Sequence, residues 1–273
     1  MFRLVFVAFA LFGFVTTSWA QVQPAPGTTP GTPPKSIVKK SAPKAKAGAK
    51  QPAAVETGPC RLGVISTLGD LFSVQKFGLT IWENEVEEVP VNGWGLDDLA
   101  VARVRVATGT DPSVRRIAYP KGAFDLFYNP KSKFLLEPNE RLEPIVQSIT
   151  LNAGCERYLV ITKFNGEVAG TKKVIKGIGA YNQGLGSAFR NSHLFANVAV
   201  NLIDGRTYER INRAFALFSV GGPPAAEFEL TKLDNSLFPD PPGSVVANAA
   251  LRDRTRALIS ATLDRVLPVY LKD

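Results

Sequence analysis

Apolar and polar residues alternate along much of the chain after residue 60, which is the two-residue period of half-buried β-strands. The clearest run is 194–203, where every second residue is apolar: Leu194, Ala196, Val198, Val200 and Leu202. Shorter β-rich runs occupy residues 63–66, 71–82, 86–91, 114–119, 157–164, 174–181 and 207–218. The polar turn 83–85 predicts a hairpin of its two neighbouring runs, and Asp204-Gly205 predicts a two-residue type I′ hairpin.

Two segments between these runs have the helical period instead. Asp97 is the predicted N-cap of a helix over 98–108 that ends at Gly109. Its apolar positions are expected to share one face: Leu99, Ala102 and Val106. A second helix is predicted around Pro144 and ends at Gly154.

A third helix is predicted at the C-terminus, after a Pro-rich loop over 219–243. It is expected to begin at the cap residue Ser244 and to stop at Pro268. Its apolar face consists of Leu251, Leu258, Ile259, Leu263, Val266 and Leu267. This order of elements predicts an α/β (α+β) fold: a mixed, largely antiparallel sheet with two or three packed helices, including the long C-terminal one.

The first 20 residues have the pattern of a secretory signal peptide. Met1-Phe2-Arg3 is a short basic start, residues 4–17 are almost wholly apolar, and small residues precede the predicted cleavage after Ala20. The alternative, a retained membrane anchor, needs about 20 apolar residues, whereas this run has 14. No later stretch approaches that length, so the sequence predicts a periplasmic or secreted protein with no stable membrane span after processing.

Residues 21–56 are built mainly from Pro, Ala, Gly, Thr, Ser and Lys, and we expect a disordered tether because they have almost nothing to bury. Its lysines are Lys35, Lys39, Lys40, Lys44, Lys46 and Lys50. They supply most of the net charge of +8, since the predicted single domain over 57–273 has 25 basic and 23 acidic residues. The tail is expected either to meet an anionic surface, such as lipid phosphates or acidic cell-wall polymers, or to serve only as a spacer. Nucleic acid is not an expected partner, because the domain has no basic cluster interleaved with aromatics.

The chain has two cysteines, and each stands at the start of a β-rich run. In an oxidising compartment an even number of cysteines favours a disulfide, here between Cys60 and Cys155. If the two runs are neighbouring parallel strands, a spacing of about 4.8 Å brings the two Cα atoms within bonding range. Two buried thiols or a redox pair are the alternatives, and the lack of Cys-x-x-Cys disfavours the redox pair.

Candidate catalytic and metal-binding residues are few. His193 is the only histidine and has no Gly-x-Ser-x-Gly elbow to serve, so a structural role is expected for it. One histidine and two cysteines exclude the usual zinc ligand sets, and no metal or cofactor is predicted. The glycines at 177–186 do not complete a dinucleotide fingerprint, and we expect them to mark bulges or close packing.

An acidic cluster surrounds the tip of the hairpin predicted over 71–91. It consists of Glu83, Glu85, Glu87 and Glu88. A calcium site would need the ligand spacing of a calcium loop, which is missing here. We therefore expect a solvated face or a patch that faces a partner.

The elements around 63–65, 116–119, 158–161 and 198–207, followed by the C-terminal helix, resemble the anticodon-binding-like module of envelope proteins. That module occurs in the TolB amino-terminal domain, in CsgG and in the LpoB-type activators of penicillin-binding proteins, and the last group also has a Pro-rich tether. The resemblance implies a non-catalytic interaction module. The chain differs from the pattern because it has no cysteine to be lipidated at the cleavage site.

The sequence therefore predicts a periplasmic or secreted, non-enzymatic interaction module that binds an envelope protein or a cell-wall component such as peptidoglycan. An open sheet edge or the 71–91 hairpin is the expected docking element. One alternative is a cell-envelope hydrolase that uses carboxylates, with Asp70 and the acids of 83–98 as its candidates. The other alternative is a carrier of a small ligand.

Overall fold

The computed structural model describes residues 58–78, 84–131, 140–168, 171, 173–185, 189–211 and 226–271, all within the compact unit 54–273. The expected signal peptide with its cleavage at Ala20, the six tether lysines and Glu83 lie outside these residues. No helix in the described ranges is long and apolar enough to cross a membrane.

Within these ranges, one mixed sheet contains eight strands: β1 (Cys60–Ser66), β2 (Leu71–Phe77), β3 (Glu85–Pro90), β4 (Val114–Arg116), β5 (Cys155–Lys163), β8 (Ile178–Leu185), β9 (Phe189–Asp204) and β10 (Ala226–Leu233). The pairs β1–β4, β1–β5 and β2–β8 are parallel. The pairs β2–β3, β5–β9, β8–β9 and β9–β10 are antiparallel. The expected α/β class with a mixed, largely antiparallel sheet is confirmed.

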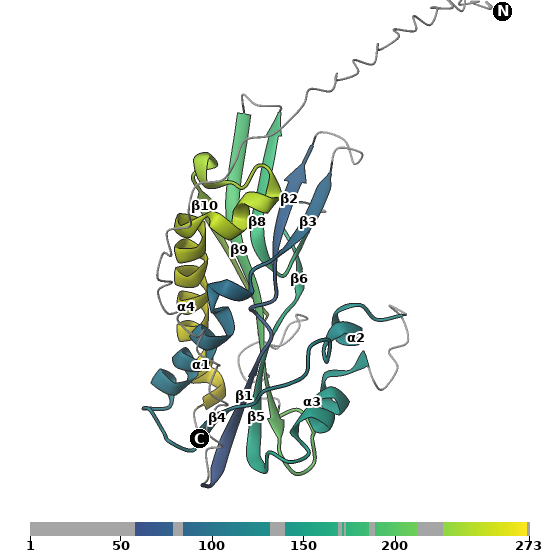
Figure 1. Ribbon diagram of the computed structural model, residues 1–273, viewed down its shortest axis with the longest axis vertical. Coiled ribbons are helices and arrows are strands. Elements are labelled where there is room, and N and C mark those ends of the chain that lie inside the picture. The colour runs from purple at the N-terminus through teal and green to yellow at the C-terminus, as the bar shows by residue number, and fades with distance from the viewer. Residues whose placement is uncertain are drawn as a thin grey trace, which may run out of the picture. The chain divides into compact units, whose positions relative to one another are not determined.

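The long strand β9 shows that the sheet is divided across its middle. β8 pairs with residues 189–196 of β9 and β5 with residues 198–204, whereas β10 pairs with residues 192–199. Because β10 overlaps both stretches, β5 and β8 lie end to end on the opposite edge of β9. Their parallel neighbours β1 and β2 also lie end to end (Figure 1). The place where β1 and β5 end and β2 and β8 begin is called the junction below.

The helices cover the two faces of the sheet unequally. α1 (Leu96–Ala107) and α4 (Ala249–Leu271) lie on one face, and α2 (Asp125–Tyr128) and α3 (Leu142–Thr150) lie on the other face beside β1 and β5 (Figure 1). A small second sheet consists of β6 (Asn165–Glu167) and β7 (Val174–Lys176). Short 3-10 helices are η2 (Asn92–Trp94), η5 (Asn235–Leu237) and η6 (Pro242–Ala247). The predicted apolar face of α4 is buried against the sheet, as expected.

Cys60 and Cys155 form a disulfide that joins the first residues of β1 and β5. The two residues are register partners in the parallel pair, and their Cα atoms are 4.5 Å apart. Both are buried in the core under α2 and α3, together with Tyr158 and Val146. The predicted disulfide is therefore confirmed, and the two strands that carry its cysteines are parallel neighbours.

The first helix begins earlier than predicted and buries another face. α1 starts at Leu96, and Asp97 does not cap it, because the carboxylate bonds to the β1–β2 connection instead. The buried residues are Leu96, Ala100, Val101 and Val104, whereas Ala102 and Val106 are exposed. The predicted face was wrong because the helix has apolar residues on more than one side, and only packing against the sheet selects between them.

Three expectations for the C-terminal part were also wrong. The loop predicted over 219–243 contains β10, which pairs with β9. Ser244 lies in η6, and the helix α4 begins at Ala249, where Asn248 Oδ1 accepts a hydrogen bond from the N–H of Leu251 at 3.0 Å. Pro268 does not stop α4, since this exposed proline lies in its last turn, where few backbone hydrogen bonds are lost.

Two strand predictions also differ from the structure at their ends. The turn after β9 extends to Thr207, and Tyr208, rather than Gly205, takes a positive φ of 57°. Of the return strand predicted over 207–218, the described part contains an isolated bridge at Arg210, and residues 212–218 lie outside it. The strand predicted over 114–119 is shorter in the structure, where β4 ends at Arg116.

Candidate functional site

A pocket of about 480 Å³, lined by both charged and apolar residues, opens at the junction of the sheet. β2, β3, the end of β5, α2 and the corner between β7 and β8 all contribute to it. Its charged residues are Asp70, Glu88, Asp125, Lys163 and Lys176. Its volume falls in the range of about 300–1,000 Å³ that is usual for small-molecule sites. We call it the junction pocket.

Lys163, the last residue of β5, is nearly buried although it is charged. Its side chain is 9% exposed, and its Nζ pairs with Oδ1 of Asp70, whose side chain is 51% exposed. The same Nζ lies 5.5 Å from the centroid of the Tyr128 ring. Both contacts offset the cost of desolvating the ammonium, which would otherwise be several kcal/mol.

Tyr128 is held by a chain of hydrogen bonds that crosses the junction. The backbone N–H of Lys163 donates to its phenol oxygen at 3.1 Å, and the phenol also bonds to the hydroxyl of Thr67. The hydroxyl of Thr67 also lies within hydrogen-bond distance of the carbonyl of Ile161, at 3.4 Å. Burial raises the pKa of Tyr128, which keeps the phenol protonated for this role. The chain fixes α2 against the end of β5.

Asp97 holds the other side of the junction, the connection between β1 and β2. Its Oδ1 accepts hydrogen bonds from the Ser66 hydroxyl at 2.7 Å and from the N–H groups of Leu68 and Gly69 at 2.8 and 3.2 Å. Burial raises the pKa of Asp97, and these hydrogen bonds oppose that rise. Asp97 therefore positions the loop that carries Asp70 instead of capping a helix.

Two glycines allow the close approach of strands around the pocket. Gly177 separates β7 from β8 with a φ of +63°, and a Cβ there would lie 3.3 Å from Cδ of Lys163. At Gly179 a Cβ would overlap the carbonyl oxygen of Ser73 and would lie 2.7 Å from Cζ of Phe195. The strand predicted over 174–181 is therefore interrupted, and the expectation of bulges or close packing is confirmed for Gly177 and Gly179, whereas Gly186 lies outside the described residues.

The acids of the predicted hairpin patch are not gathered at one point. Glu85 pairs with Lys76 at 3.4 Å, Glu87 is exposed, and Glu88 lines the junction pocket. The structure brings Glu88 and Asp70, two of the acids named for the hydrolase alternative, to the same pocket. In the described part of the chain, no group of three or more His, Cys, Asp or Glu side chains could hold a metal ion.

His193 lies in β9, away from the junction pocket. Its ring stacks on Tyr181 with the centroids 5.0 Å apart, and burial lowers its pKa. It is not among the residues that line the pocket with Asp70. This placement favours the structural role expected for the only histidine.

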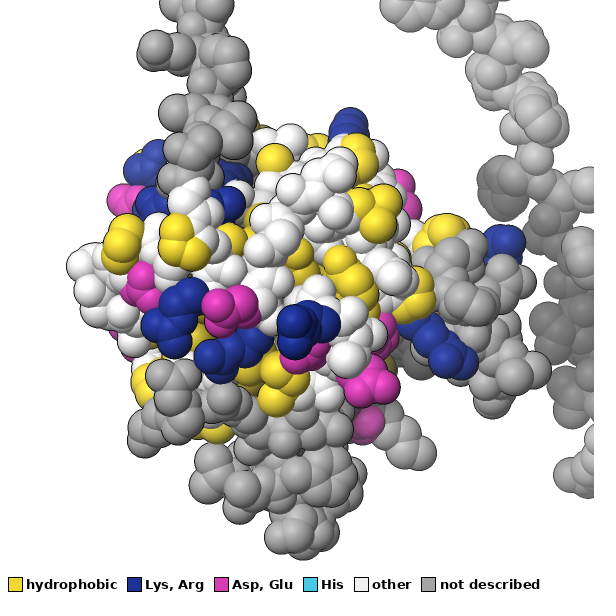
Figure 2. Space-filling view, turned by 90° about the horizontal axis from the view of Figure 1, so that it is seen from below, with side chains coloured by type: hydrophobic (Ala, Val, Ile, Leu, Met, Phe, Trp, Pro, Cys, Tyr) yellow, Lys and Arg dark blue, Asp and Glu magenta, His cyan; other side chains and the backbone are white. Residues whose placement is uncertain are grey.

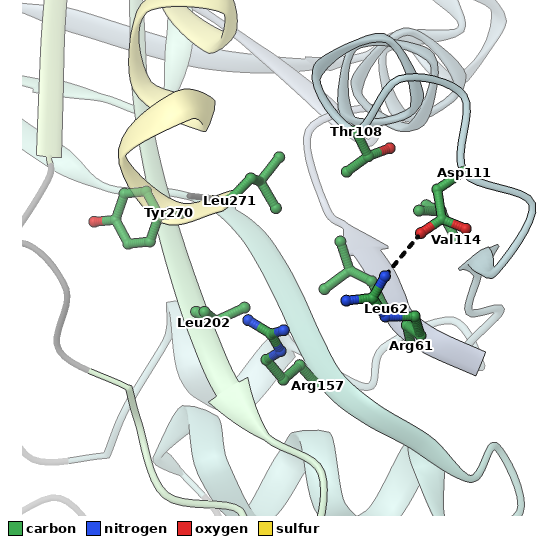
Figure 3. A pocket seen from close by; sticks show the side chains of 9 residues that line it. All are labelled: Arg61, Leu62, Thr108, Asp111, Val114, Arg157, Leu202, Tyr270 and Leu271. Atoms are coloured by element: carbon green, nitrogen blue, oxygen red, sulfur yellow. Dashed lines mark ion pairs between the residues drawn. The ribbon is translucent and has the colours of Figure 1, made fainter. Parts of the chain in front are cut away.

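A smaller pocket of about 150 Å³ lies between β1, β5, β9 and the C-terminal ends of α1 and α4 (Figure 3). Arg61 pairs there with Asp111 at 3.7 Å, and Arg157 extends from the neighbouring strand (Figure 3). Arginines beside helix C-termini are favourable for the helix dipoles, so we assign them a structural role. Figure 2, which views the molecule from below, shows basic and acidic side chains next to one another instead of a field of one sign.

No protein-family model and no curated protein matches this chain. One solved structure that resembles it is a Xanthomonas campestris protein of the family DUF330, with 12% sequence identity, a TM-score of 0.30, and coverage of 78% of this chain and 88% of that one. A similarity at this level carries neither fold nor function from that protein to this chain. The resemblance to the anticodon-binding-like module gains no support from it.

Sequence reasoning missed Lys163 and Tyr128, the two residues that organise the junction pocket. For Lys163 a signal was present, because a lysine directly follows the apolar run 158–162 at a position that continues a buried strand. Tyr128 lies in a segment without any periodic pattern, and the short helix α2 was not predicted.

Proposed function

We propose that this protein is an extracytoplasmic interaction module that recognises an envelope protein or a cell-wall component. It would consist of a cleaved signal peptide (1–20), a basic tether (21–56) and a single binding domain (57–273). The disulfide supports the compartment, because such bonds persist in oxidising environments. Six lysines without a neighbouring acid in residues 21–55 would hold the domain close to an anionic surface.

The observation that carries the proposal is the junction pocket beside an open strand edge. β3 pairs with β2 on one side, and no strand in the described ranges pairs with its other side. Residues 85–88 of β3 are exposed, so an extended partner segment can add to this edge through backbone hydrogen bonds. Glu88 belongs to both features, which makes β3 and the pocket one continuous surface.

The acids on β3 also have a role in the absence of a partner. Charged side chains on an edge strand discourage pairing between identical molecules. The same charges favour a partner with basic residues, since complementary charge speeds encounter and rejects wrong partners. Recognition at this edge is therefore expected to be selective.

A carboxylate hydrolase is the second candidate, because Asp70, Glu88 and Asp125 line one pocket. Such hydrolysis needs a carboxyl group that donates a proton while a second carboxylate attacks or activates water. Asp70 is instead bonded to the ammonium of Lys163 and to the N–H of Leu71. This arrangement suits the binding of a polar ligand better than the donation of a proton.

In-cell photo-crosslinking with mass spectrometry tests the proposal. A photoreactive amino acid is placed at Val86 of β3, which is 48% exposed, and at the control position Val106 of α1, which is 59% exposed. Both positions are examined in the full chain and in a variant that lacks residues 21–56. We expect a dominant adduct with one envelope component from position 86 and none from position 106.

The two chains separate the parts of the proposal. An adduct at position 86 that persists without the tether would establish recognition by the domain. If the adduct is lost when the tether is removed, the tether lysines are what binds the partner, and the proposed role of β3 is contradicted. If neither chain gives an adduct, the interaction module is rejected and the hydrolase becomes the leading candidate.

A further inference from the structure

We infer that the junction pocket binds an α-amino acid group, in which an ammonium and a carboxylate are attached to the same carbon. Lys163 would hold the carboxylate and Asp70 the ammonium. The inference rests on the proposed binding role of this pocket and adds the chemical class of its ligand.

The first step concerns the unused donors of Lys163. An ammonium has three N–H donors, and among the described residues its one acceptor is Oδ1 of Asp70. The side chain is 9% exposed and lines the pocket, so its remaining donors are available to a ligand that enters there. A ligand that supplies two oxygen atoms to these donors would form charge-assisted hydrogen bonds, which are stronger than neutral ones.

The second step concerns the open oxygen of Asp70. Its Oδ1 accepts both from Lys163 and from the N–H of Leu71, the latter at 2.8 Å, whereas Oδ2 bonds to none of the described residues. The ion pair therefore presents free donors and a free acceptor side by side. A zwitterion with its two charges on one carbon is complementary to such a pair, because each charge faces its opposite.

The remaining charges of the pocket favour the same ligand class. A purely anionic ligand would be repelled by Asp70, Glu88 and Asp125, and a purely cationic one by Lys163 and Lys176. A ligand with both charges avoids both penalties. The charges therefore exclude simple anions and simple cations as preferred ligands.

An apolar wall determines which side chain the ligand would carry. Besides Tyr128, five apolar residues line the pocket: Leu71, Phe127, Pro130, Phe164 and Ile178. At about 480 Å³ the pocket has room for an aromatic side chain or for the next residue of a peptide. We therefore expect a large apolar amino acid to bind more tightly than alanine.

Isothermal titration of the mature protein with phenylalanine tests this inference. N-acetylphenylalanine lacks the ammonium, phenylalaninamide lacks the carboxylate, and inorganic phosphate is a plain anion. We expect saturable binding of phenylalanine and binding weaker by about tenfold or more for each blocked analogue, since each loses one charge-assisted interaction. This comparison uses the unaltered protein, so it does not depend on whether a variant folds.

Three variants then test the two residues. Lys163→Met keeps the length of the stem and removes the donors, and Asp70→Asn removes the charge that would hold the ammonium. Lys232→Met, at an exposed position of β10 outside the pocket, is the matched control. Circular dichroism checks that each variant is folded. We expect the first two to weaken phenylalanine binding by about tenfold or more and the control to leave it unchanged.

The inference is overturned if phenylalanine shows no binding at about 10 mM, which corresponds to less than about 3 kcal/mol. It is also overturned if N-acetylphenylalanine or phosphate binds as tightly as phenylalanine, because the pocket would then be an anion site. Unchanged binding in Lys163→Met has the same consequence. An adduct at position 86 without any amino acid binding would preserve the interaction module and discard this ligand class alone.

Discussion

Reduction of the Cys60–Cys155 disulfide should destabilise the domain by about 4–5 kcal/mol. The bond closes a loop with a sequence separation of 95 residues. In the chain-entropy model, releasing a loop of that length returns about 16 cal/mol/K to the unfolded chain, which is about 4.7 kcal/mol at 25 °C. For a domain of this size that loss corresponds to a fall in Tm of about 10–20 °C.

The assay is urea denaturation of the mature protein, followed by fluorescence, with and without a phosphine reductant. Thiol titration confirms that two thiols appear on reduction. The control is the double variant Cys60→Ala/Cys155→Ala, measured under both conditions, which must not respond to the reductant. Because both cysteines are buried at 6% and 5% exposure, this variant also loses apolar contacts and should be no more stable than the reduced protein.

The reasoning fails if the oxidised and reduced proteins differ by less than about 1 kcal/mol. Such a result would mean that the unfolded chain is not restrained by the bond as the entropy model requires. A mature protein from the periplasm that already contains two free thiols would contradict the disulfide itself.

Three further predictions concern the junction. Gly179→Ala should lower the free energy of unfolding by about 3 kcal/mol or more, because the new Cβ would overlap the carbonyl oxygen of Ser73. The control Gly93→Ala, with nothing within 4 Å of its Cβ, should change it by less than about 1 kcal/mol. Equal unfolding curves for the two variants would refute the close approach at Gly179. Tyr128→Phe should cost about 1–3 kcal/mol in urea denaturation, because a buried N–H and a buried hydroxyl lose their partner, and an unchanged midpoint would argue against the hydrogen-bond chain. Burial raises the pKa of the Asp97 carboxyl above 3.8, so the folded state binds a proton at this group more tightly than the unfolded state does. The folded state therefore loses stability as the pH rises above 3.8 through the folded-state pKa. The stability advantage of the wild type over Asp97→Asn should therefore be larger at about pH 4 than at about pH 7, and the reverse order would show that the sign is wrong.

The junction pocket could not have been predicted from local pattern. Lys163 and Asp70 are 93 residues apart, and their meeting depends on the end-to-end order of β1 with β2 and of β5 with β8. The spacing of apolar residues along the chain does not determine which strands lie end to end in the sheet. The acidic residue Glu88 was singled out from the sequence, but its place beside Asp70 follows from the pairing of β3 with β2.

The sequence by itself determined the features that depend on neighbours along the chain. Alternation identified β9, helical spacing identified the buried face of α4, and the position of each cysteine at a strand start identified the disulfide. Only the tertiary structure decided the buried face of α1, the strand β10 within an expected loop, and the approach of Lys163 to Asp70. The physical reason is that hydrophobic period is a local property, whereas register and the choice between two apolar faces are set by contacts between segments far apart in the chain.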